Sequence, residues 1–389
     1  MRQILEGSNA IARLIKDISP GVVSAYPITP QTHIVEDLAK FKADGQAGYE
    51  YVRAESEFSA ASIVAGASAT GVRTYTATSS QGLLLMCEVV FNIAGMRLPV
   101  VMTVANRAIS APINIWNDQS DAMVVRDAGW IMLFSENIQE TIEQHLLAFR
   151  VAEKLKIPVM VNLDGFVLTH TFEPVELPDK KTIKKFLPDY RPKAGEYLDP
   201  ANPVTLGALA TPDDYMEIRE DLSKDVLGSA TALAEEGARL AKILNSSGSH
   251  SSANPFVEYY GPKNPKIILV ALGSVIGTMK EAADEINSKK FGFGNKVGVL
   301  KIKCFRPFPH KEIADILKTA KQVAVLDKSI SLGHLGPLAS DIRSISLAGK
   351  TQIKSFIAGL GGRDITRAMI KKIAADFPKS SVDGPNFVG

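Results

Sequence analysis

The feature of this sequence that most limits its possible folds is a regular alternation of short apolar runs with helical patterns. The apolar runs predict strands at 21–27, 49–54, 72–79, 98–105, 131–136 and 157–165, and the patterns between them predict helices at 34–42, 56–70, 82–95 and 138–155. Strands that alternate with helices imply crossover connections, and therefore an α/β fold with a parallel sheet covered by helices on both faces. The nearly continuous apolar character of the runs fits a sheet buried on both sides.

The alternation is interrupted once, which predicts two domains. Residues 166–262 are punctuated by prolines and contain the Ser/Gly/Asn-rich stretch "NSSGSHSSANP", typical of an exposed linker. From "KIILVALGS" onward, strand and helix patterns return. Because 389 residues exceed one ordinary core, we predict a large domain over 1–245, a linker over 246–262 and a smaller α/β domain over 263–389.

Composition excludes several classes of function. The net charge of +2 comes with no basic stripe, so we expect no nucleic-acid partner, and we interpret the basic stretch at 180–193 as a solvated connector. No apolar run is long enough to span a membrane and the N-terminus lacks a signal-peptide pattern, so we expect no membrane association and a cytoplasmic location.

The two cysteines, Cys87 and Cys304, cannot ligate an iron–sulfur cluster alone, and the six histidines show no metal-ligand spacing. We therefore expect no metal in this chain.

Ligands of open parallel sheets bind beyond the carboxyl ends of the strands, so the strand-to-helix loops are the candidate sites. In "AYPITPQT", Pro27 ends a strand, Thr29 is placed as a helix N-cap and Pro30 as the first helical residue. This explains the corner without any ligand. The alternative is that the helix N-terminus, with the Thr29 hydroxyl, holds an anion such as a carboxylate.

The next loop, "RAESEF", places Glu57 in the first turn of a helix made of small residues. Such a glutamate is usually a partner of the helix dipole. The absence of bulky side chains behind it would also let a flat cofactor or a second polypeptide pack closely.

Two further loops carry polar residues. "ATSSQG" at 77–82 either presents hydroxyls to a ligand or is a capped helix start, and the long loop 106–121 begins with Arg107, a suitable partner for a carboxylate. Phosphate-loop, dinucleotide-binding and nucleophile-elbow motifs are absent from the sequence, and "GLGGRD" at 359–364 is interpreted as a tight turn.

Taken together, these loops resemble a known family. "AYPITPQT", "ESEFSA", "TATSSQGLLLM", "NRAISAPINIWNDQSD" and "PVMVNLDGFVLTHT", with "KCFRPFP" and "AVLDKSISLGHLGPL" further on, are similar to the α subunits of multi-subunit pyruvate:ferredoxin oxidoreductases of the 2-oxoacid:ferredoxin oxidoreductase family. The resemblance covers essentially the whole chain. It implies a pyrimidine-type thiamine-diphosphate-binding domain followed by a smaller transketolase C-terminal-like α/β domain.

The resemblance also implies an activity and its residues. The family oxidatively decarboxylates pyruvate with thiamine diphosphate and coenzyme A, passes electrons through [4Fe–4S] clusters to ferredoxin and releases acetyl-CoA. Glu57 matches the glutamate that contacts the cofactor's aminopyrimidine ring, Thr29 and Arg107 match the residues that hold the substrate carboxylate, and Pro27 lies in the loop against the cofactor. At the next position stands Phe58, where relatives often have histidine.

Half of the expected thiamine site is missing from the sequence. The family's GDG motif for Mg²⁺ and the diphosphate is absent, since "LDGF" and "VDGP" lack the leading glycine. The resemblance assigns that half and one cluster to a β subunit, and the other clusters to further iron–sulfur and γ subunits. Three alternatives stay open: another 2-oxoacid such as 2-oxoglutarate as substrate, a non-catalytic scaffold subunit, and a nucleotide-dependent dehydrogenase, which the missing glycine fingerprint disfavours.

Overall fold

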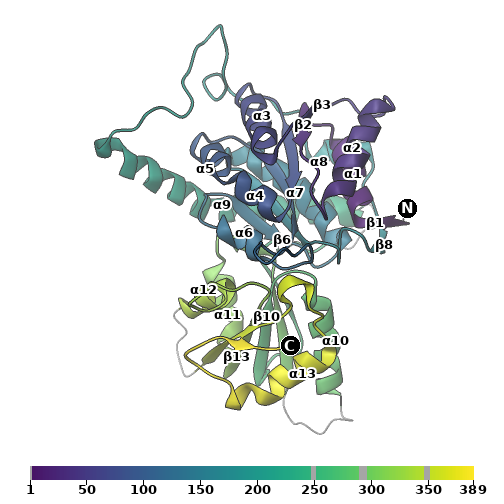
Figure 1. Ribbon diagram of the computed structural model, residues 1–389, viewed down its shortest axis with the longest axis vertical. Helices are drawn as coiled ribbons and strands as arrows, with labels where there is room; N and C mark the ends of the chain where they lie inside the picture. The colour runs from purple at the N-terminus through teal and green to yellow at the C-terminus, as the bar shows by residue number, and fades with distance from the viewer. Residues whose placement is uncertain (1, 247–250, 289–295, 346–350) are drawn as a thin grey trace.

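The computed structural model describes residues 2–246, 251–288, 296–345 and 351–389, which form two sheet-centred halves stacked along the long axis (Figure 1). The upper half in this view is built by the N-terminal part of the chain and the lower half by the C-terminal part. The predicted α/β class is confirmed.

The first half is built on a seven-stranded sheet. Its strands, in spatial order, are β12 (Cys304–Arg306), β6 (Ile131–Phe134), β7 (Val159–Asp164), β5 (Val101–Asn106), β4 (Thr74–Thr78), β2 (Val22–Ala25) and β3 (Glu50–Arg53). All neighbouring pairs are parallel except β12 with β6. A small antiparallel pair, β1 (Gln3–Glu6) with β8 (Phe172–Val175), lies beside it.

Helices cover both faces of this sheet, because side chains of a strand alternate between the faces. On β5, Val101 and Ala105 pack into the cluster that contains α1 and α7, whereas Met102 and Val104 pack into the cluster of α3 and α5. The helices of this half are α1 (Gly7–Ile18), α2 (Thr32–Ala43), α3 (Glu57–Ala69), α4 (Ser80–Leu85), α5 (Cys87–Gly95), α6 (Ser120–Val124), α7 (Ile138–Leu155), α8 (Lys180–Phe186) and α9 (Pro212–Ser246).

The longest helix lies where the sequence predicted irregular structure. Helix α9 has 35 residues, beginning at Pro212, and its first turns extend away from the body of the molecule (Figure 1). Its buried side chains begin only at Leu222. A helix that packs along half of its length gives a weak amphipathic pattern, which explains why the sequence did not reveal it.

The second half contains a six-stranded sheet. Its strands, in spatial order, are β15 (Asn386–Phe387), β14 (Gln352–Ile357), β13 (Gln322–Asp327), β10 (Ile267–Ala271), β11 (Val297–Ile302) and β9 (Val257–Tyr260). Only β9 is antiparallel to its neighbour. The helices are α10 (Val275–Asn287), α11 (His310–Leu317), α12 (Pro337–Arg343) and α13 (Arg367–Asp376), with the 3₁₀ turns η2 (Leu360–Gly362) and η3 (Phe377–Lys379).

The two halves share structure across their boundary. The run "KVGVLKIKCF" divides at Lys303: β11 belongs to the second sheet, whereas β12 pairs with β6 at the edge of the first. Strand β9 lies inside the range predicted as a linker, and residues 247–250 of that range lie outside the described residues. One hydrophobic cluster also runs from Ile11 in the first half to Val325 in the second. The exact domain boundaries stay a prediction.

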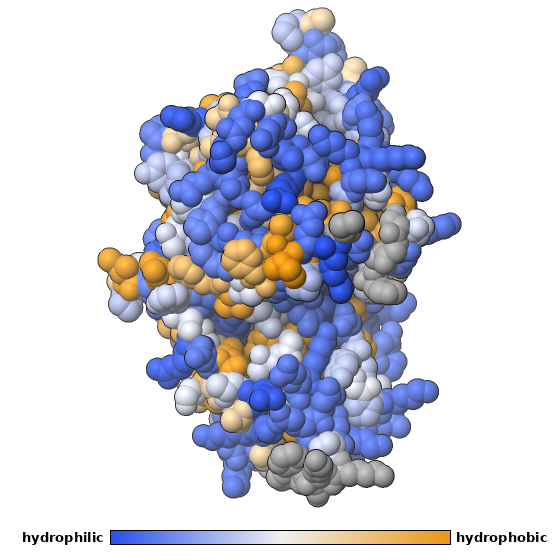
Figure 2. Space-filling view, turned by 90° about the vertical axis from the view of Figure 1, so that its right-hand side faces the viewer, coloured by the Kyte–Doolittle hydropathy of each residue, from blue (hydrophilic) through white to orange (hydrophobic). Residues whose placement is uncertain are grey.

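The surface is hydrophilic above and below a band of hydrophobic residues at mid-height, on the side where β1 and β8 lie (Figure 2). Ile4 and Phe172 of these two strands are each 66% exposed. Among the described residues, no helix has the length and apolar character needed to cross a membrane.

Candidate active site

The loops predicted to carry chemistry meet at the carboxyl edge of the first sheet. Arg107, which follows β5, donates from Nη1 to the carbonyl oxygen of Thr29 in the loop after β2 (3.0 Å). The amide of Ser80, after β4, donates to Asp121 at the far end of the long loop after β5 (2.9 Å). Parallel strands end at one edge, and this geometry brings together residues that are far apart in sequence.

The loop after β2 does not begin its helix as predicted. Thr29 is not the N-cap: helix α2 begins at Thr32, the N-cap position is Gln31, and the Thr29–Pro30 peptide is cis. The fully buried Gln31 side chain donates to the carbonyl oxygen of Ala77 on β4 (2.6 Å) and accepts from the amide of Ile28 (3.3 Å). These bonds fix residues 28–31 as a separate turn, so the helix begins only at Thr32. Thr29 and Pro27 are exposed at the edge of the sheet.

Glu57 is the first residue of α3, as predicted, and its side chain is buried at 7% exposure. The cap of this helix is Ser56, whose hydroxyl accepts from the amide of Ser59 (3.2 Å), so Glu57 is not needed for capping. Among the described residues its carboxylate has no hydrogen-bond or ion-pair partner. It lies over Gly82, where a Cβ atom would be 2.7 Å from Glu57 Oε1 and 2.6 Å from Thr78 Oγ1. The neighbouring Phe58 is 39% exposed.

Buried polar atoms without partners also occur in the segment 78–81, next to Gly82. Thr78 Oγ1, Ser79 Oγ and Gln81 Nε2 are buried and make no hydrogen bond within the described part of the chain. Ser79 occupies the N-cap position of α4 but its side chain caps nothing, so the interpretation of "ATSSQG" as a capped helix start is wrong. Buried polar groups are almost always satisfied, so these atoms are available to hydrogen-bond a polar ligand or water.

Arg107 is held in place from two sides. Its Nε donates to the carbonyl oxygen of Asn114 (2.9 Å) and its Nη1 to that of Thr29 (3.0 Å), while Nη2 has no partner among the described residues. The side chain is nearly buried, and burial lowers the pKa of Arg107, which nearby Asp121 partly offsets. A guanidinium fixed by neutral carbonyls and not neutralised by a direct ion pair can accept an anionic ligand.

Asp121 connects two loops at the carboxyl edge of the first sheet, a role that the sequence did not reveal. Its carboxylate accepts from the amides of Ser80 (2.9 Å) and Arg107 (3.0 Å) and from Asn106 Nδ2 (2.9 Å). Complete burial raises the pKa of Asp121 to about 7. Only its position in the longest loop pointed to it, because the contact that links this loop to the segment after β4 comes from the distant Ser80.

The long loop 106–121 is hydrogen-bonded to the second half of the molecule. The turn at "GLGGRD" is η2, with positive φ at Gly359, Gly361 and Gly362, which confirms the predicted tight turn. The carbonyl oxygen of Gly361 accepts from Asn114 Nδ2 (3.1 Å), and its amide donates to Asp118 Oδ2 (3.2 Å). Since Asn114 in turn holds Arg107, the C-terminal half positions the candidate anion ligand.

A buried ion pair joins the two halves behind this loop. Lys328 Nζ lies 3.0 Å from Asp164 Oδ2 and also donates to Asn117 Oδ1. Burial opposes ionisation of Asp164, but Lys328 and the hydroxyl of Ser274 (2.5 Å) outweigh it, so the pKa of Asp164 is lowered. The amide of Gln119 donates to the carbonyl oxygen of Lys328 (2.8 Å). Asn117 and Gln119 of the long loop are thus fixed to the second half.

Comparisons with known proteins show which family the chain resembles. The sequence profile described as "Pyruvate flavodoxin/ferredoxin oxidoreductase, thiamine diP-bdg" matches residues 14–236, and that of "Pyruvate:ferredoxin oxidoreductase core domain II" matches residues 265–370. The chain is 45% identical to pyruvate synthase subunit PorA of Methanocaldococcus jannaschii, over 100% of this chain and 97% of that protein. It is 38% identical to ketoisovalerate oxidoreductase subunit VorA of Pyrococcus abyssi, over 97% and 94%.

A solved structure has the same fold. The 2-oxoglutarate:ferredoxin oxidoreductase from Magnetococcus marinus, with 2-oxoglutarate, coenzyme A and succinyl-CoA bound, superposes with a TM-score of 0.74 at 20% identity. The match covers 96% of this chain and 65% of that longer chain.

Proposed function

This chain belongs to the pyruvate flavodoxin/ferredoxin oxidoreductase family, and we propose that it is the α subunit of a complex that oxidises pyruvate. The complex converts pyruvate, coenzyme A and two oxidised ferredoxins into acetyl-CoA, CO₂, two reduced ferredoxins and a proton. The observation that carries the proposal is the buried carboxylate of Glu57, which has no hydrogen-bond partner among the described residues and lies near Thr78 Oγ1, at the sheet edge that also carries Arg107.

The residues present fit the pyrimidine half of thiamine diphosphate. Small side chains line α3 behind Glu57, and the unsatisfied Thr78, Ser79 and Gln81 offer hydrogen bonds to a polar ring. When bound, the cofactor supplies a nucleophilic thiazolium carbon and takes up the electron pair of the carboxylate bond that breaks. Glu57 then holds a proton between its carboxyl oxygen and a ring nitrogen, which favours the tautomer that activates that carbon.

Arg107 and Thr29 orient the substrate. The free Nη2 of Arg107 and the exposed hydroxyl of Thr29 lie on one loop edge, with the backbone of Thr29 fixed by Arg107 itself (3.0 Å). A guanidinium and a hydroxyl grip a carboxylate and so hold the carbonyl of a 2-oxoacid toward the cofactor, with Pro27 in the same loop. Catalysis here is by positioning, and no further acid or base from this chain is needed.

The other half of the chemistry belongs to partner chains. Burial raises the pKa of the Cys304 thiol, and the only other cysteine is Cys87, so the described part of this chain offers no cluster ligands. Relatives named as subunits indicate a multi-subunit oxidoreductase. We assign Mg²⁺ and the diphosphate to a β subunit and the [4Fe–4S] clusters to β and γ-type subunits, with ferredoxin as acceptor and coenzyme A as co-substrate. A cytoplasmic location is part of this proposal.

The exposed apolar residues beside the site fit a subunit interface that completes it. Ile113 is 86% exposed and Trp116 52% exposed, both in the loop that carries Arg107. Large exposed apolar side chains grouped around a site mark a surface that another protein covers.

Glu57→Ala in the reconstituted complex tests the catalytic assignment. We expect pyruvate-dependent viologen reduction to fall by about three orders of magnitude or more, because a positioned proton contributes roughly 10²–10⁴-fold. A matched control is Glu55→Ala, which removes an exposed carboxylate two residues earlier. Unchanged turnover in Glu57→Ala would favour a non-catalytic scaffold subunit.

The substrate is tested separately with the wild-type complex. The similarity to a ketoisovalerate oxidoreductase subunit keeps branched-chain 2-oxoacids as the second candidate, with 2-oxoglutarate as a third. We expect the highest kcat/KM with pyruvate, and a higher value with either competitor would change the substrate assignment.

A further inference from the structure

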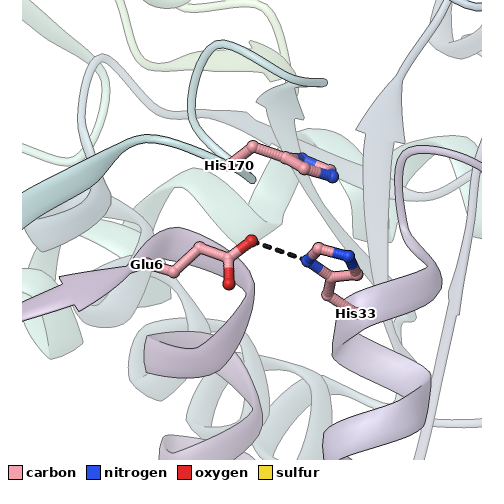
Figure 3. A group of neighbouring side chains, drawn as sticks. All are labelled: Glu6, His33 and His170. Carbon is pink, nitrogen blue, oxygen red and sulfur yellow. Dashed lines mark hydrogen bonds and ion pairs between the residues drawn. The ribbon is translucent and has the colours of Figure 1, made fainter.

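A second group of chemically active side chains lies apart from the residues assigned to thiamine and pyruvate. Glu6, His33 and His170 converge from the end of β1, the first turn of α2 and the loop before β8 (Figure 3). Each offers one ligand atom, and these atoms all lie within 4.8 Å of one another. The proposed function uses none of the three. The sequence predicted no metal site here because nothing in the spacing of these residues links them.

The geometry points to a binding site for a divalent transition-metal ion, held by two imidazoles and one carboxylate. In a tetrahedral site with bonds of about 2.0–2.1 Å, neighbouring ligand atoms are about 3.3–3.4 Å apart. Glu6 Oε1 and His33 Nδ1 are now 2.7 Å apart, joined by a hydrogen bond, and the other separations extend to at most 4.8 Å. The Glu6 and His33 side chains are partly exposed, which leaves them free to adjust these separations when an ion binds.

Hydrogen bonds orient the imidazole of His170 for metal binding. The Nδ1 atom of His170 lies 2.7 Å from the hydroxyl of Thr169, which is itself fixed by the amide of Phe166 (2.8 Å). In the tautomer in which His170 Nδ1–H donates to this hydroxyl, the lone pair of Nε2 is free, as in metal sites where a second partner orients the histidine.

The surroundings leave room for the ion and its water ligands. A hollow of about 480 Å³ borders the cluster and is lined by Glu6, His33, Asn9 and the carboxylates of Glu36 and Asp37. One cation, Arg13, also borders it and bonds to Gln3 (3.1 Å). The side chain of His33 is 46% exposed, so an ion can enter from solvent and complete its coordination with water.

The types of ligand atom determine which metal ions the site prefers. Imidazole with one carboxylate suits Zn²⁺, Co²⁺ and Ni²⁺, whereas Mg²⁺ and Ca²⁺ prefer oxygen ligands alone. The site has no thiolate, which excludes a cluster or a soft ion such as Cu(I) as the natural occupant.

An ion at this position would connect two segments that flank the substrate loop. His33 lies three positions after Pro30, at the start of α2. The ring of His170 stacks on Phe166 (4.9 Å between centroids), and Phe166 stacks on Trp116 of the Arg107 loop (4.7 Å). The ion would therefore stabilise the entrance of the site structurally, without taking part in the reaction.

Metal binding to the purified full-length chain tests this inference independently of the enzymatic proposal. Equilibrium dialysis with Zn²⁺ should give one ion per wild-type chain beyond the level bound by His33→Gln and His170→Gln. Co²⁺ should give a visible absorption band that both variants lack. Affinity should fall by at least about tenfold in each variant, and by about tenfold in Thr169→Val, which removes only the partner of His170.

The matched control is His310→Gln, an exposed histidine at the start of α11, which should bind as wild type. Circular dichroism shows whether the variants fold, and Glu6→Gln provides a third ligand variant on a partly exposed side chain. Equal Zn²⁺ binding by wild type and both histidine variants, or no wild-type binding at micromolar Zn²⁺, would overturn the assignment.

Discussion

At Gly82, the addition of a single methyl group should be enough to lower the activity. In Gly82→Ala the added methyl would lie 2.6 Å from Thr78 Oγ1, 2.7 Å from Glu57 Oε1 and 2.8 Å from Glu57 Cγ. Carbon atoms pack at about 3.5–4.0 Å, so the Glu57 stem must move by roughly 0.7 Å or more. Thr78 is fully buried on a central strand, which leaves Glu57 as the group that yields.

The magnitude follows from this displacement. A misplacement of about 1 Å costs on the order of 10²-fold in rate, so we expect kcat/KM for pyruvate to fall about hundredfold, equivalent to about 2.7 kcal/mol. Overpacking should destabilise the fold by only about 1–3 kcal/mol. The effect on activity should therefore appear in a protein that still folds and assembles.

The assay is pyruvate-dependent viologen reduction by the reconstituted complex, with thermal unfolding measured in parallel. Gly66→Ala is the matched control: it lies on α3 itself and has no atom within 4 Å of the added methyl, so activity should be unchanged. Full activity of Gly82→Ala would refute the reasoning, because Glu57 would then not need the position it occupies.

Two further predictions concern stability. Burial lowers the pKa of His145 to about 4, so the unfolded chain binds more protons between about pH 4 and 6.5 and stability is lost as pH falls through that window. Asp121, whose pKa is raised to about 7, has the opposite slope in this window, so the His145 contribution is read as a difference: between pH 7.5 and 5, urea unfolding of the wild type should lose about 2 kcal/mol relative to His145→Gln; equal slopes would contradict this. Lys328→Met leaves the buried Asp164 charge unpaired and should cost about 3–5 kcal/mol, measured by denaturant unfolding. Lys318→Met, which breaks an exposed pair, is its control and should leave the midpoint unchanged.

Local patterns were sufficient to predict the elements that carry Glu57. Its strand, its turn and its helix each follow from short-range periodicity, and the closeness of Thr29 to Arg107 follows from the shared edge of parallel strands. The N-cap role predicted for Thr29 is wrong because a long-range bond from Gln31 to β4 decides where the helix begins.

What the sequence could not predict depends on contacts between distant segments. Asp121 links two loops because Ser80, 41 positions earlier, donates to it. The cluster of Glu6, His33 and His170 likewise needs three segments to be placed together. Short-range periodicity carries no information about such contacts, since each residue alone is compatible with an ordinary surface role.

Strand β12 follows β11 of the second sheet in the sequence but completes the first sheet, which affects how the chain folds during translation. Until residues 304–306 have left the exit tunnel, the N-terminal sheet ends at β6, whose outer backbone groups lack their partner. Open sheet edges invite pairing with other chains, so the nascent N-terminal half is exposed to aggregation for most of translation. Completion of the first sheet thus waits for the second half to be synthesised, and the two halves are obliged to mature as one unit.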